Sequence, residues 1–383
     1  MISSMSTTLG IDPAVEPLLR EERLLDTGIW AVVMAGGIGS RFWPLSSPQR
    51  PKPLLTLVSE RPLVSEAVVR LDPLVPPERV LVATSADIVA GVREALPNVP
   101  EANILVEPRP LGTAAALAWA ARQVEVRAGL DCVLCAIHAD IATGFPALFR
   151  ELLARAARVA ADGQTVAIAV RPTRAEPAFG YIVPEPDREG SLSLQEGGVR
   201  QVLRYVEKPD LETANQLLAR GALWYSGILM ASVGALRDAL RRCTVELAPG
   251  AEALDALDFA GFAAAVGSIS IERGLLERYD RLLTMLGDFG WDDVGTWASL
   301  RRSRELDDAG NGAVGPVQFV DSSTNIVHAE SGSVVLYGVD QLLTVCVPGL
   351  VFVTTLDRAA DLKPLLDALP ADIRSGPAPA TGT

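Results

Sequence analysis

The chain has 383 residues, of which 49% are hydrophobic and 21% are charged, and its formal net charge at pH 7 is −13. This composition is typical of a folded globular protein with enough apolar material for a large core. The negative charge argues against a nucleic-acid partner, because binding a phosphate backbone requires a basic face, but a nucleotide needs only a local cluster of cations.

Neither a membrane span nor a secretory signal is predicted. No uninterrupted apolar run approaches the roughly 20 residues that cross a bilayer, and the N-terminal residues lack a basic stretch followed by an apolar core. We therefore expect a cytoplasmic protein without a membrane partner. Cys132 and Cys135 form a CxxC inside an apolar run, with no second CxxC or histidine pair nearby, so we interpret both thiols as structural.

The first part of the chain predicts alternating strands and helices. Residues 1–26 form a polar N-terminal appendage with room for one short helix near 16–25. Continuous apolar runs, which suit strands buried on both faces, follow at 29–34, 79–84, 103–106, 132–137 and 165–170. Helical patterns lie between them at 62–71, 86–95, 113–126 and 145–161. This alternation predicts an α/β fold with a doubly wound, mostly parallel sheet over residues 27–308.

The pattern changes twice further along the chain. Short strands at 180–183, 199–206 and 223–230 around a helix at 211–219 predict an antiparallel insertion, and helices resume near residues 233, 251, 272 and 294. Short β stretches then recur at 317–320, 324–327, 333–337, 342–347 and 350–354, with a helix at 358–369. We expect a small all-β C-terminal domain over 309–372 and a disordered tail over 373–383.

The segment "MAGGIGSRFWPLSSPQRPKPLL" (residues 34–55) follows the first predicted strand. Its glycines let backbone N–H groups approach phosphate oxygens, but the spacing matches neither the dinucleotide fingerprint nor the P-loop. Arg41 and Lys52 can place two cations around one polyphosphate, the alternative being a glycine turn with solvated charges. Lys52 is one of only three lysines, with Lys208 and Lys363.

Acidic residues follow other predicted strands. Glu107 and Asp140 each come directly after or close to the end of an apolar run, and Asp293 lies in the loop "DFGWDDVG" at 288–295. In doubly wound sheets, ligands bind beyond the carboxyl ends of the strands, where the glycine loop, Glu107 and Asp140 converge. Asp140 and Asp293 are oxygen donors of the kind that Mg²⁺ prefers, and helix capping is the alternative for both.

These motifs resemble those of the nucleotidyltransferases that make nucleotide sugars. The variant "FWPLS" is most similar to mannose-1-phosphate guanylyltransferases (GDP-mannose pyrophosphorylases). The similarity continues in the family's order through motifs near residues 107, 113, 140, 172, 180, 206, 224, 268 and 290. The resemblance implies a Rossmann-like nucleotidyltransferase domain and a β-helix-like C-terminal domain.

The resemblance also implies roles for individual residues. Arg41 and Lys52 are the expected catalytic cations, on the β,γ-phosphates and near the α-phosphate, and Asp140 and Asp293 are expected to hold Mg²⁺. The nucleotide is expected at Ala35, Gly36, Gly37, Gly39, Ser40, Arg41, Lys52, Glu107, Pro108 and Thr113. The sugar phosphate is expected at Gly180, Tyr181, Glu207, Lys208 and Ser226.

The expected substrates are GTP and mannose 1-phosphate, with GDP-mannose and pyrophosphate as products. The chain departs from the family pattern near the base and the sugar, at Gly112, Ile141, Ala178 and Tyr225. A different pair of nucleotide and sugar 1-phosphate is therefore an open alternative, as is a non-catalytic sensor of nucleotide sugars. By family analogy, we expect that the β domain provides the contact surface of a homodimer.

Overall fold

The computed structural model describes residues 28–36, 40–47, 50–187, 192–194 and 196–374. The predicted appendage at 1–26, Gly37, Gly39 and residues 375–383 of the predicted tail lie outside these ranges. Among the helices of the described ranges, none is both long and apolar enough to cross a membrane.

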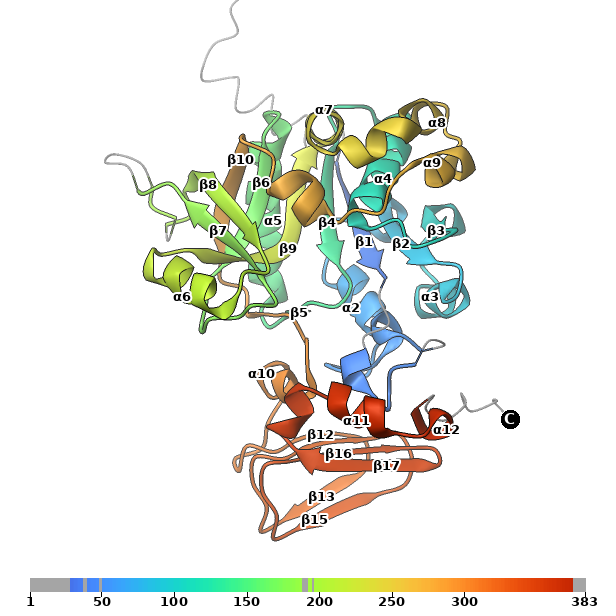
Figure 1. Ribbon diagram of the computed structural model, residues 1–383, viewed down its shortest axis with the longest axis vertical. Coiled ribbons are helices and arrows are strands. Elements are labelled where there is room, and N and C mark those ends of the chain that lie inside the picture. The colour runs from blue at the N-terminus through green and yellow to red at the C-terminus, as the bar shows by residue number, and fades with distance from the viewer. Residues whose placement is uncertain (1–27, 37–39, 48–49, 188–191, 195, 375–383) are drawn as a thin grey trace, which may run out of the picture.

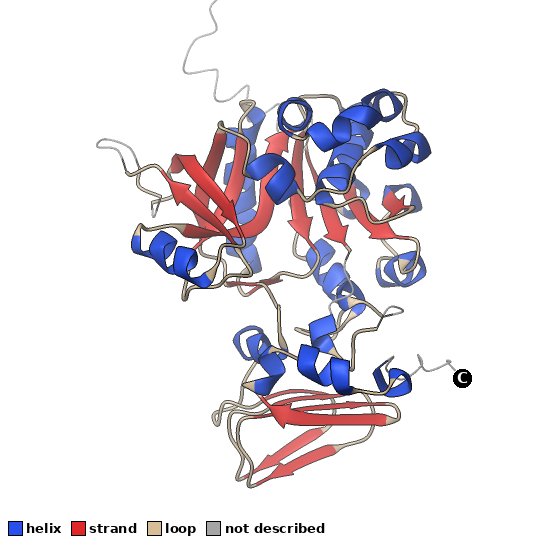
Figure 2. Ribbon diagram, viewed as in Figure 1, coloured by secondary structure: helices blue, strands red, loops and turns tan. Residues whose placement is uncertain are grey.

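The larger part of the described chain is built on a nine-stranded sheet (Figures 1 and 2). The strand order is β3-β2-β1-β4-β9-β6-β10-β8-β7. In this sheet, β8 and β9 run against the other strands. The strands are β1 (Ile29–Ala35), β2 (Val80–Ser85), β3 (Ile104–Glu107), β4 (Val133–His138), β6 (Thr165–Val170), β7 (Gly180–Pro184), β8 (Val199–Glu207), β9 (Leu223–Ser232) and β10 (Leu282–Gly287).

The central strands are apolar throughout because both faces of the sheet are covered. In β1, Ala31 and Val33 face one hydrophobic core, while Val32 and Met34 face the other. The same alternation separates Cys135 from Cys132, so their thiols lie on opposite faces of the sheet. Burial raises the pKa of both thiols. This arrangement supports the structural interpretation of the CxxC.

Helices cover the two faces of the sheet (Figure 2). One face packs against α2 (Leu63–Val69), α3 (Val89–Ala95), α5 (Pro146–Ala161) and α6 (Leu211–Ala219). The other face packs against α4 (Thr113–Ala128), α7 (Val233–Cys243), α8 (Ala251–Asp255), α9 (Phe259–Ala265) and a π-helical turn at Glu272–Leu276. These three layers confirm the doubly wound α/β fold predicted from the sequence.

The C-terminal strands form a small domain of their own, drawn in orange and red in Figure 1. Three of them stack in parallel, and their bounds are β12 (Gly312–Val314), β14 (Ile326–Ala329) and β16 (Leu342–Val347). The antiparallel strand β17 (Leu350–Thr355) closes this sheet, and β13 (Val317–Val320) pairs in parallel with β15 (Val334–Tyr337). Parallel strands stacked in successive coils confirm the β-helix-like domain. Two short helices follow, α11 (Lys363–Ala368) and α12 (Ala371–Arg374).

A third hydrophobic core joins the two parts of the molecule. It packs Phe42, Trp43 and Leu55, from the segment after the glycine loop, against C-terminal residues such as Phe352. Trp43 contacts the Phe352 ring edge-on at 5.2 Å between centroids, and its indole N–H donates to the carbonyl of Arg374 at 3.2 Å. The segment that follows the glycine loop therefore rests on the C-terminal domain (Figure 1).

Candidate active site

The carboxyl ends of β1 and β4 lie side by side and begin two of the predicted site loops. Met34 pairs with His138 in parallel register, and the N–H of Ala139 donates to the carbonyl of Met34 at 3.1 Å. The hydroxyl of Thr84 on β2 donates to the carbonyl of Ala35 at 3.2 Å, which holds the end of β1. Gly36 and Asp140 therefore follow neighbouring strands at one edge of the sheet, as the sequence predicts.

A short ribbon brings the two predicted metal ligands to the same place. Strand β5 (Ala142–Thr143) starts two residues after Asp140, and β11 (Trp291–Asp292) ends directly before Asp293. The two strands pair antiparallel. The buried Arg70, directly after α2, supports the ribbon, because its Nη1 donates to the carbonyl of Ile141 at 2.6 Å and to the Thr143 hydroxyl at 3.1 Å.

Lys52 reaches between these two loops. Its side chain is nearly buried, and its ammonium donates to Oδ2 of Asp140 at 2.9 Å and to the main-chain carbonyl of Asp293 at 3.2 Å. Burial alone would raise the pKa of Asp140, but the charges of Lys52 and His138, together with the hydrogen bonds that the carboxylate accepts from Lys52 and from the main chain, outweigh it and hold that pKa below its usual value. Asp140 is therefore an ionised oxygen donor at neutral pH.

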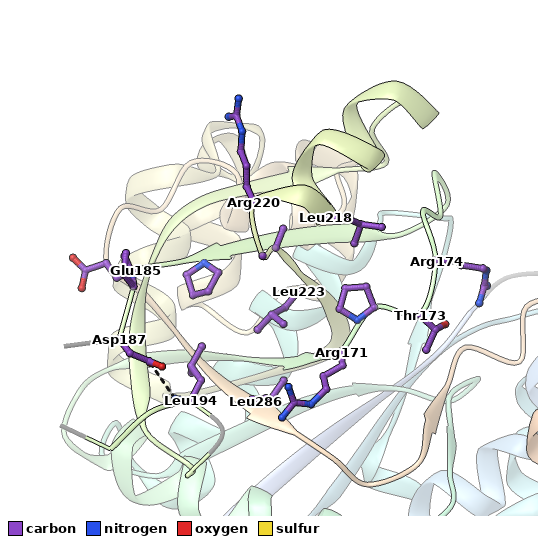
Figure 3. A pocket seen from close by; sticks show the side chains of 15 residues that line it. Arg171, Thr173, Arg174, Glu185, Asp187, Leu194, Leu218, Arg220, Leu223 and Leu286 are labelled. Carbon is purple, nitrogen blue, oxygen red and sulfur yellow. Dashed lines mark hydrogen bonds between the residues drawn. The ribbon is translucent and has the colours of Figure 1, made fainter. Parts of the chain in front are cut away.

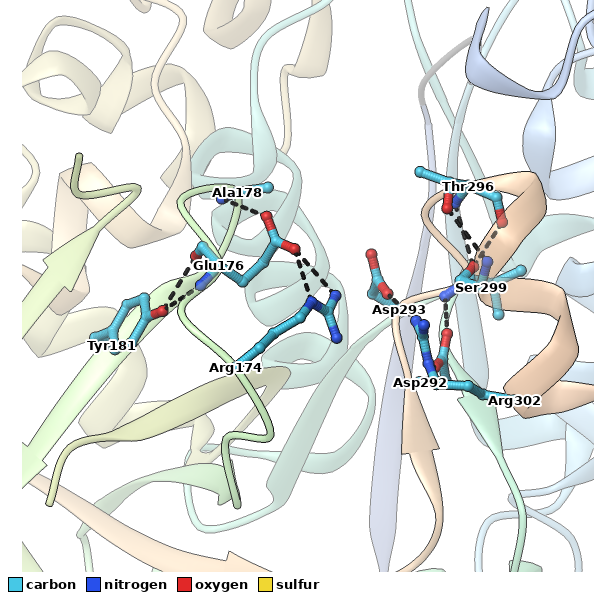
Figure 4. A network of polar contacts seen from close by, with 10 residues as sticks. Arg174, Glu176, Ala178, Tyr181, Asp292, Asp293, Thr296, Ser299 and Arg302 are labelled. Atoms are coloured by element: carbon cyan, nitrogen blue, oxygen red, sulfur yellow. Dashed lines mark hydrogen bonds and ion pairs between the residues drawn. The ribbon is translucent and has the colours of Figure 1, made fainter. Parts of the chain in front are cut away.

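Asp293 sits on a strained turn. The next residue, Val294, has a φ of +42°, which is a costly conformation for a β-branched residue. The Val294 side chain is fully buried in the third core, and its N–H donates to Oδ1 of Asp292 at 2.9 Å. Arg302 pairs with Asp292 at 2.5 Å and lies 3.8 Å from Oδ1 of Asp293 (Figure 4).

The donors at this site fit a magnesium ion. Burial, followed by the charge of Asp292, raises the pKa of Asp293 although Lys52, Arg302 and Arg174 oppose the shift. A cation near Asp293 would therefore relieve an incompletely neutralised carboxylate. No group of three or more His, Cys, Asp or Glu side chains suited to a metal occurs in the described ranges. Asp140 and Asp293 as ligands, completed by substrate phosphate and water, match the way Mg²⁺ is usually bound.

The nucleotide side of the predicted site is less enclosed. Arg41 is exposed and forms no ion pair with the rest of the described chain, Ser40 begins a short 3₁₀ turn, and Pro108 is exposed. Glu107 ends β3, and within the described residues its Oε1 is buried without a hydrogen-bond partner. Burial raises the pKa of Glu107 to about 7. An unpaired carboxylate oxygen at this edge is suited to accept N–H groups from a ligand.

Gly112 and Thr113 begin helix α4 beside the segment at 268–271. Gly112 has a φ of +84°, and a Cβ there would lie 2.3 Å from the carbonyl oxygen of Ile269. The hydroxyl of Thr113 accepts the N–H of Ile271 at 2.8 Å. Only glycine fits here, so the departure from the family pattern at position 112 has a steric reason in this chain.

The predicted sugar-phosphate residues divide into two groups. Gly180, Glu207 and Lys208 lie together, since the phenol of Tyr205 donates to Oε2 of Glu207 at 2.9 Å and Lys208 pairs with Oε1 at 3.2 Å. A Cβ at Gly180 would lie 1.9 Å from the Tyr205 hydroxyl, so only glycine fits. Lys208 is exposed and has a φ of +48°.

The side chains of Tyr181 and Ser226 belong to the scaffold. Tyr181 is fully buried, and its hydroxyl accepts the N–H of Glu176 at 2.8 Å (Figure 4). The Ser226 hydroxyl is buried and donates to the carbonyl of Ile168 at 2.7 Å. Both side chains are therefore engaged within the scaffold, and the carbonyl of Ser226 also accepts the indole N–H of Trp291 at 2.9 Å.

Residues that the sequence reasoning did not assign to the site surround it. Phe179 contacts the rings of Trp224 and Trp291 edge-on, with centroids 4.9 Å and 5.5 Å apart. Arg174 stacks over Trp224 at 5.4 Å and pairs with Glu176 at 3.0 Å (Figure 4). The tryptophans belong to family motifs, which is the signal that could have found this aromatic cluster.

Two aromatic side chains, His138 and Tyr225, lie near Gly227, and Tyr225 is one of the departures from the family pattern. The imidazole Nε2 of His138 lies 3.9 Å from Oε1 of Glu272, and a Cβ at Gly227 would come within 3.1 Å of the His138 ring. Tyr225 is buried and meets Tyr205 edge-on at 5.7 Å. His138, Tyr225 and Gly227 thus line one small cavity together.

A cavity of about 730 Å³ lies beyond the ends of β6 and β10 (Figure 3). Arg171, Arg174 and Arg220 line it together with Glu185 and Asp187. None of its lining residues belongs to the predicted nucleotide, sugar or metal sites. The cavity borders the candidate site through Arg174, which also stacks over Trp224.

A doubly wound sheet whose carboxyl edge carries a glycine loop, a buried lysine and two aspartates is typical of α/β enzymes that act on phosphate compounds. The family model for nucleotidyl transferases matches residues 30–309. The chain belongs to the nucleotidyl transferase family.

Individual relatives share most of the chain. It is 30% identical over 354 residues to a mannose-1-phosphate guanylyltransferase of Sinorhizobium fredii, covering 89% of this chain and 67% of the relative. It is also 30% identical to a mannose-1-phosphate guanylyltransferase of Escherichia coli, covering 90% of this chain and 74% of the relative. The crystal structure of a mannose-1-phosphate geranyltransferase from Thermus thermophilus superposes with a TM-score of 0.78 at 33% identity, covering 88% of this chain and 98% of that one.

Proposed function

We propose that this chain transfers a guanylyl group from GTP to mannose 1-phosphate and releases GDP-mannose and pyrophosphate. The observation that carries the proposal is the ammonium of Lys52 held between Asp140 and the Asp293 loop at the carboxyl edge of the sheet. Membership of the nucleotidyl transferase family and the names of the relatives support the reaction and the substrates.

The reaction needs no general base. A phosphate oxygen of mannose 1-phosphate is already anionic at pH 7, so it attacks the α-phosphorus of GTP directly. A new P–O bond forms as the bond between the α-phosphorus and the bridging oxygen breaks, and pyrophosphate leaves with that electron pair. The barrier arises from bringing two anions together, so positioning and charge stabilisation supply the catalysis.

Different residues of the chain position the substrates and stabilise the charge. Lys52 stabilises charge near the α-phosphate, and Arg41 holds the β- and γ-phosphates at the exposed side of the loop. Glu107 accepts N–H groups of the base, and the unpaired Oε1 supports this role. Glu207 and Lys208 bind the sugar phosphate. Position-by-position similarity to the family supports each assignment.

Asp140 and Asp293 would hold Mg²⁺. When bound, such an ion neutralises phosphate charge and makes the α-phosphorus more electrophilic. Lys52 donates to Asp140, so this carboxylate is kept ionised and fixed in place at the edge of the sheet.

Replacing Asp293 with asparagine should lower turnover by about 10²- to 10³-fold, because a preorganised charge is lost. The loss should come with a higher Mg²⁺ concentration for half-maximal rate, measured by Mg²⁺ titration of pyrophosphate release. Asp288→Asn, at an exposed aspartate in the same loop, is the matched control and should behave as wild type. Turnover of Asp293→Asn at the wild-type rate would remove the metal assignment.

The reaction itself is tested by pyrophosphate release across a panel of nucleoside triphosphates and sugar 1-phosphates with Mg²⁺. GTP with mannose 1-phosphate should be the fastest pair. Faster release from UTP with glucose 1-phosphate would overturn the choice of substrates. Binding of GDP-mannose without turnover of any pair would overturn the enzymatic function in favour of a sensor. The cytoplasmic location and the homodimer stay predictions.

A further inference from the structure

A bidentate ion pair connects the C-terminal domain to the segment that carries Lys52. Nη1 and Nη2 of Arg50 donate to Oε2 and Oε1 of Glu330, each at 2.6 Å. Glu330 follows β14 directly, and Arg50 precedes Lys52 by two residues. A guanidinium held by both carboxylate oxygens is fixed in orientation as well as in distance. The pair therefore restricts the backbone just before Lys52.

A buried histidine, His328, contacts Glu330 and helps to hold its carboxylate in place. His328 is fully buried, and Nη2 of Arg304 lies 3.0 Å from its Nδ1. A guanidinium has only donors, so Nδ1 must accept and the proton of the neutral ring lies on Nε2. Nε2 faces Oε1 of Glu330 at 3.4 Å, so it donates toward the carboxylate that holds Arg50. Burial lowers the pKa of His328, which agrees with a neutral ring.

The same network holds the other end of the segment. Nε of the buried Arg304 donates to the carbonyl of Leu57 at 2.7 Å, and its Nη1 donates to the carbonyl of Val327 at 3.2 Å. Arg50 and Leu57 flank the short 3₁₀ turn Lys52–Leu54. Both flanks of this turn are thus attached to β14 of the C-terminal domain and the residue after it.

The position of this turn decides whether Lys52 reaches its partners. The ammonium must come within 2.9 Å of Asp140 and 3.2 Å of the Asp293 carbonyl, on loops from two other parts of the chain. A misplacement of about 1 Å is enough to impair a charge that stabilises a transition state. Restraining both flanks of the turn therefore places the ammonium.

We propose that Arg50 and Glu330 are positioning residues, and that with His328 and Arg304 they form a latch through which the C-terminal domain places Lys52. The proposal rests on the proposed function for the role of Lys52 in turnover. The contacts that make the latch lie outside the nucleotide, sugar and metal sites. Breaking it should leave substrate binding groups in place while Lys52 loses its position.

Lysine labelling tests the latch without any substrate. Because the chain has only Lys52, Lys208 and Lys363, trace acetylation followed by peptide mass spectrometry reports each side chain separately, and the exposed Lys208 and Lys363 serve as internal references. In the full-length wild-type protein, Lys52 should label more slowly than both. Glu330→Gln should raise the Lys52 rate relative to the references about fivefold, because loss of a charge-assisted hydrogen bond populates locally open states. Glu101→Gln, which breaks the exposed Arg93–Glu101 pair, is the matched control and should leave it unchanged.

Turnover gives a second readout. Glu330→Gln should lower kcat about tenfold while KM for GTP changes by less than about twofold, because only the placement of a transition-state charge is lost. Arg50→Gln should have the same effect on labelling and kcat. The double variant should be no worse than the more affected single variant, since the two residues act as one unit.

Wild-type Lys52 labelling in folded Glu330→Gln or Arg50→Gln would overturn the latch, and so would additive effects in the double variant. Arg50 is the more exposed partner, so Arg50→Gln keeps the proposal testable if Glu330→Gln does not fold. If no substrate pair is turned over by wild-type protein, the labelling result still decides the latch. Failure of the latch and failure of the proposed function are thus distinguishable.

Discussion

Lys52 is the residue on which the proposed chemistry depends most. Lys52→Met keeps the apolar stem but removes the ammonium between Asp140 and the Asp293 loop. We expect kcat to fall by about 10²-fold, corresponding to about 3 kcal/mol for one preorganised charge. Steady-state pyrophosphate release measures this loss.

Lys363→Met is the matched control for Lys52→Met, because Lys363 is exposed at the start of α11. It should keep the wild-type kcat. A Lys52→Met variant with kcat within about threefold of wild type would contradict the catalytic role of the ammonium, since a preorganised charge contributes far more than that.

The raised pKa of Glu107 predicts that the stability of the folded protein depends on pH. Burial raises its pKa from an ordinary 4.5 to about 7 in the folded chain. A carboxyl whose pKa is raised by folding stabilises the protein at low pH, and this contribution is lost as the pH rises from 4.5 through 7. Glu107→Gln should therefore unfold at higher urea concentration than wild type at about pH 8, and the difference should shrink at about pH 5.

The control for Glu107 is Glu94→Gln, at an exposed carboxylate on α3. Its urea midpoint should follow that of wild type at both pH values. A Glu107→Gln variant that is less stable than wild type at the higher pH would show that the carboxylate is favourably paired rather than buried without a partner.

At the scale of elements, the apolar runs predicted the central strands because a strand covered on both faces must be apolar at every position. Strand β10 was missed, since its run "LLTMLG" follows a helical stretch and reads equally well as helix. Strands β5 and β11 have two residues each, so they leave no periodic signal, although they bring Asp140 and Asp293 together.

Sequence motifs predicted most residues of the candidate site. They did not predict which of these residues contact each other across long separations in the chain. Lys52 meets Asp140 over 88 positions, and Arg50 meets Glu330 over 280. Such pairs form because the sheet edge and the third core bring their elements together. Composition and periodicity describe neighbours along one element, so they do not reveal these pairs.

The two glycines at the ends of helix α4 differ in how closely other residues pack against them. Gly112 and Gly129 flank the helix and have nearly the same φ, at +84° and +85°. A Cβ added at Gly112 would clash with the carbonyl of Ile269, whereas a Cβ added at Gly129 would meet no atom within 4 Å. Each Gly→Ala change should cost about 1 to 3 kcal/mol for backbone strain. The clash should make Gly112→Ala the more destabilising by about 2 kcal/mol, measured by urea unfolding. Equal effects would mean that the segment at 268–271 is not packed on α4 as described.

At the scale of the whole molecule, the third core makes the two parts of the chain dependent on each other. Phe352 of β17 packs on Trp43 of the segment after the glycine loop. Phe352→Ala should destabilise the protein by about 3 kcal/mol and shift one calorimetric transition as a unit. Val351→Ala, at the neighbouring residue that is 61% exposed, should change stability by less than about 0.5 kcal/mol. Two separate transitions in the wild-type protein would contradict a shared core.

The central claim is guanylyl transfer to mannose 1-phosphate at the edge of the sheet that Lys52, Asp140 and Asp293 share. The most direct test offers the enzyme equal concentrations of the four nucleoside triphosphates, with mannose 1-phosphate, glucose 1-phosphate and Mg²⁺ together, and identifies the nucleotide sugars by mass spectrometry. Because mannose and glucose are isomers of equal mass, the mannose 1-phosphate carries a ¹³C label, and the mass of each product then identifies both its base and its sugar. GDP-mannose as the main product is the predicted result. A main product with another base or sugar, or no nucleotide sugar at all, would contradict it.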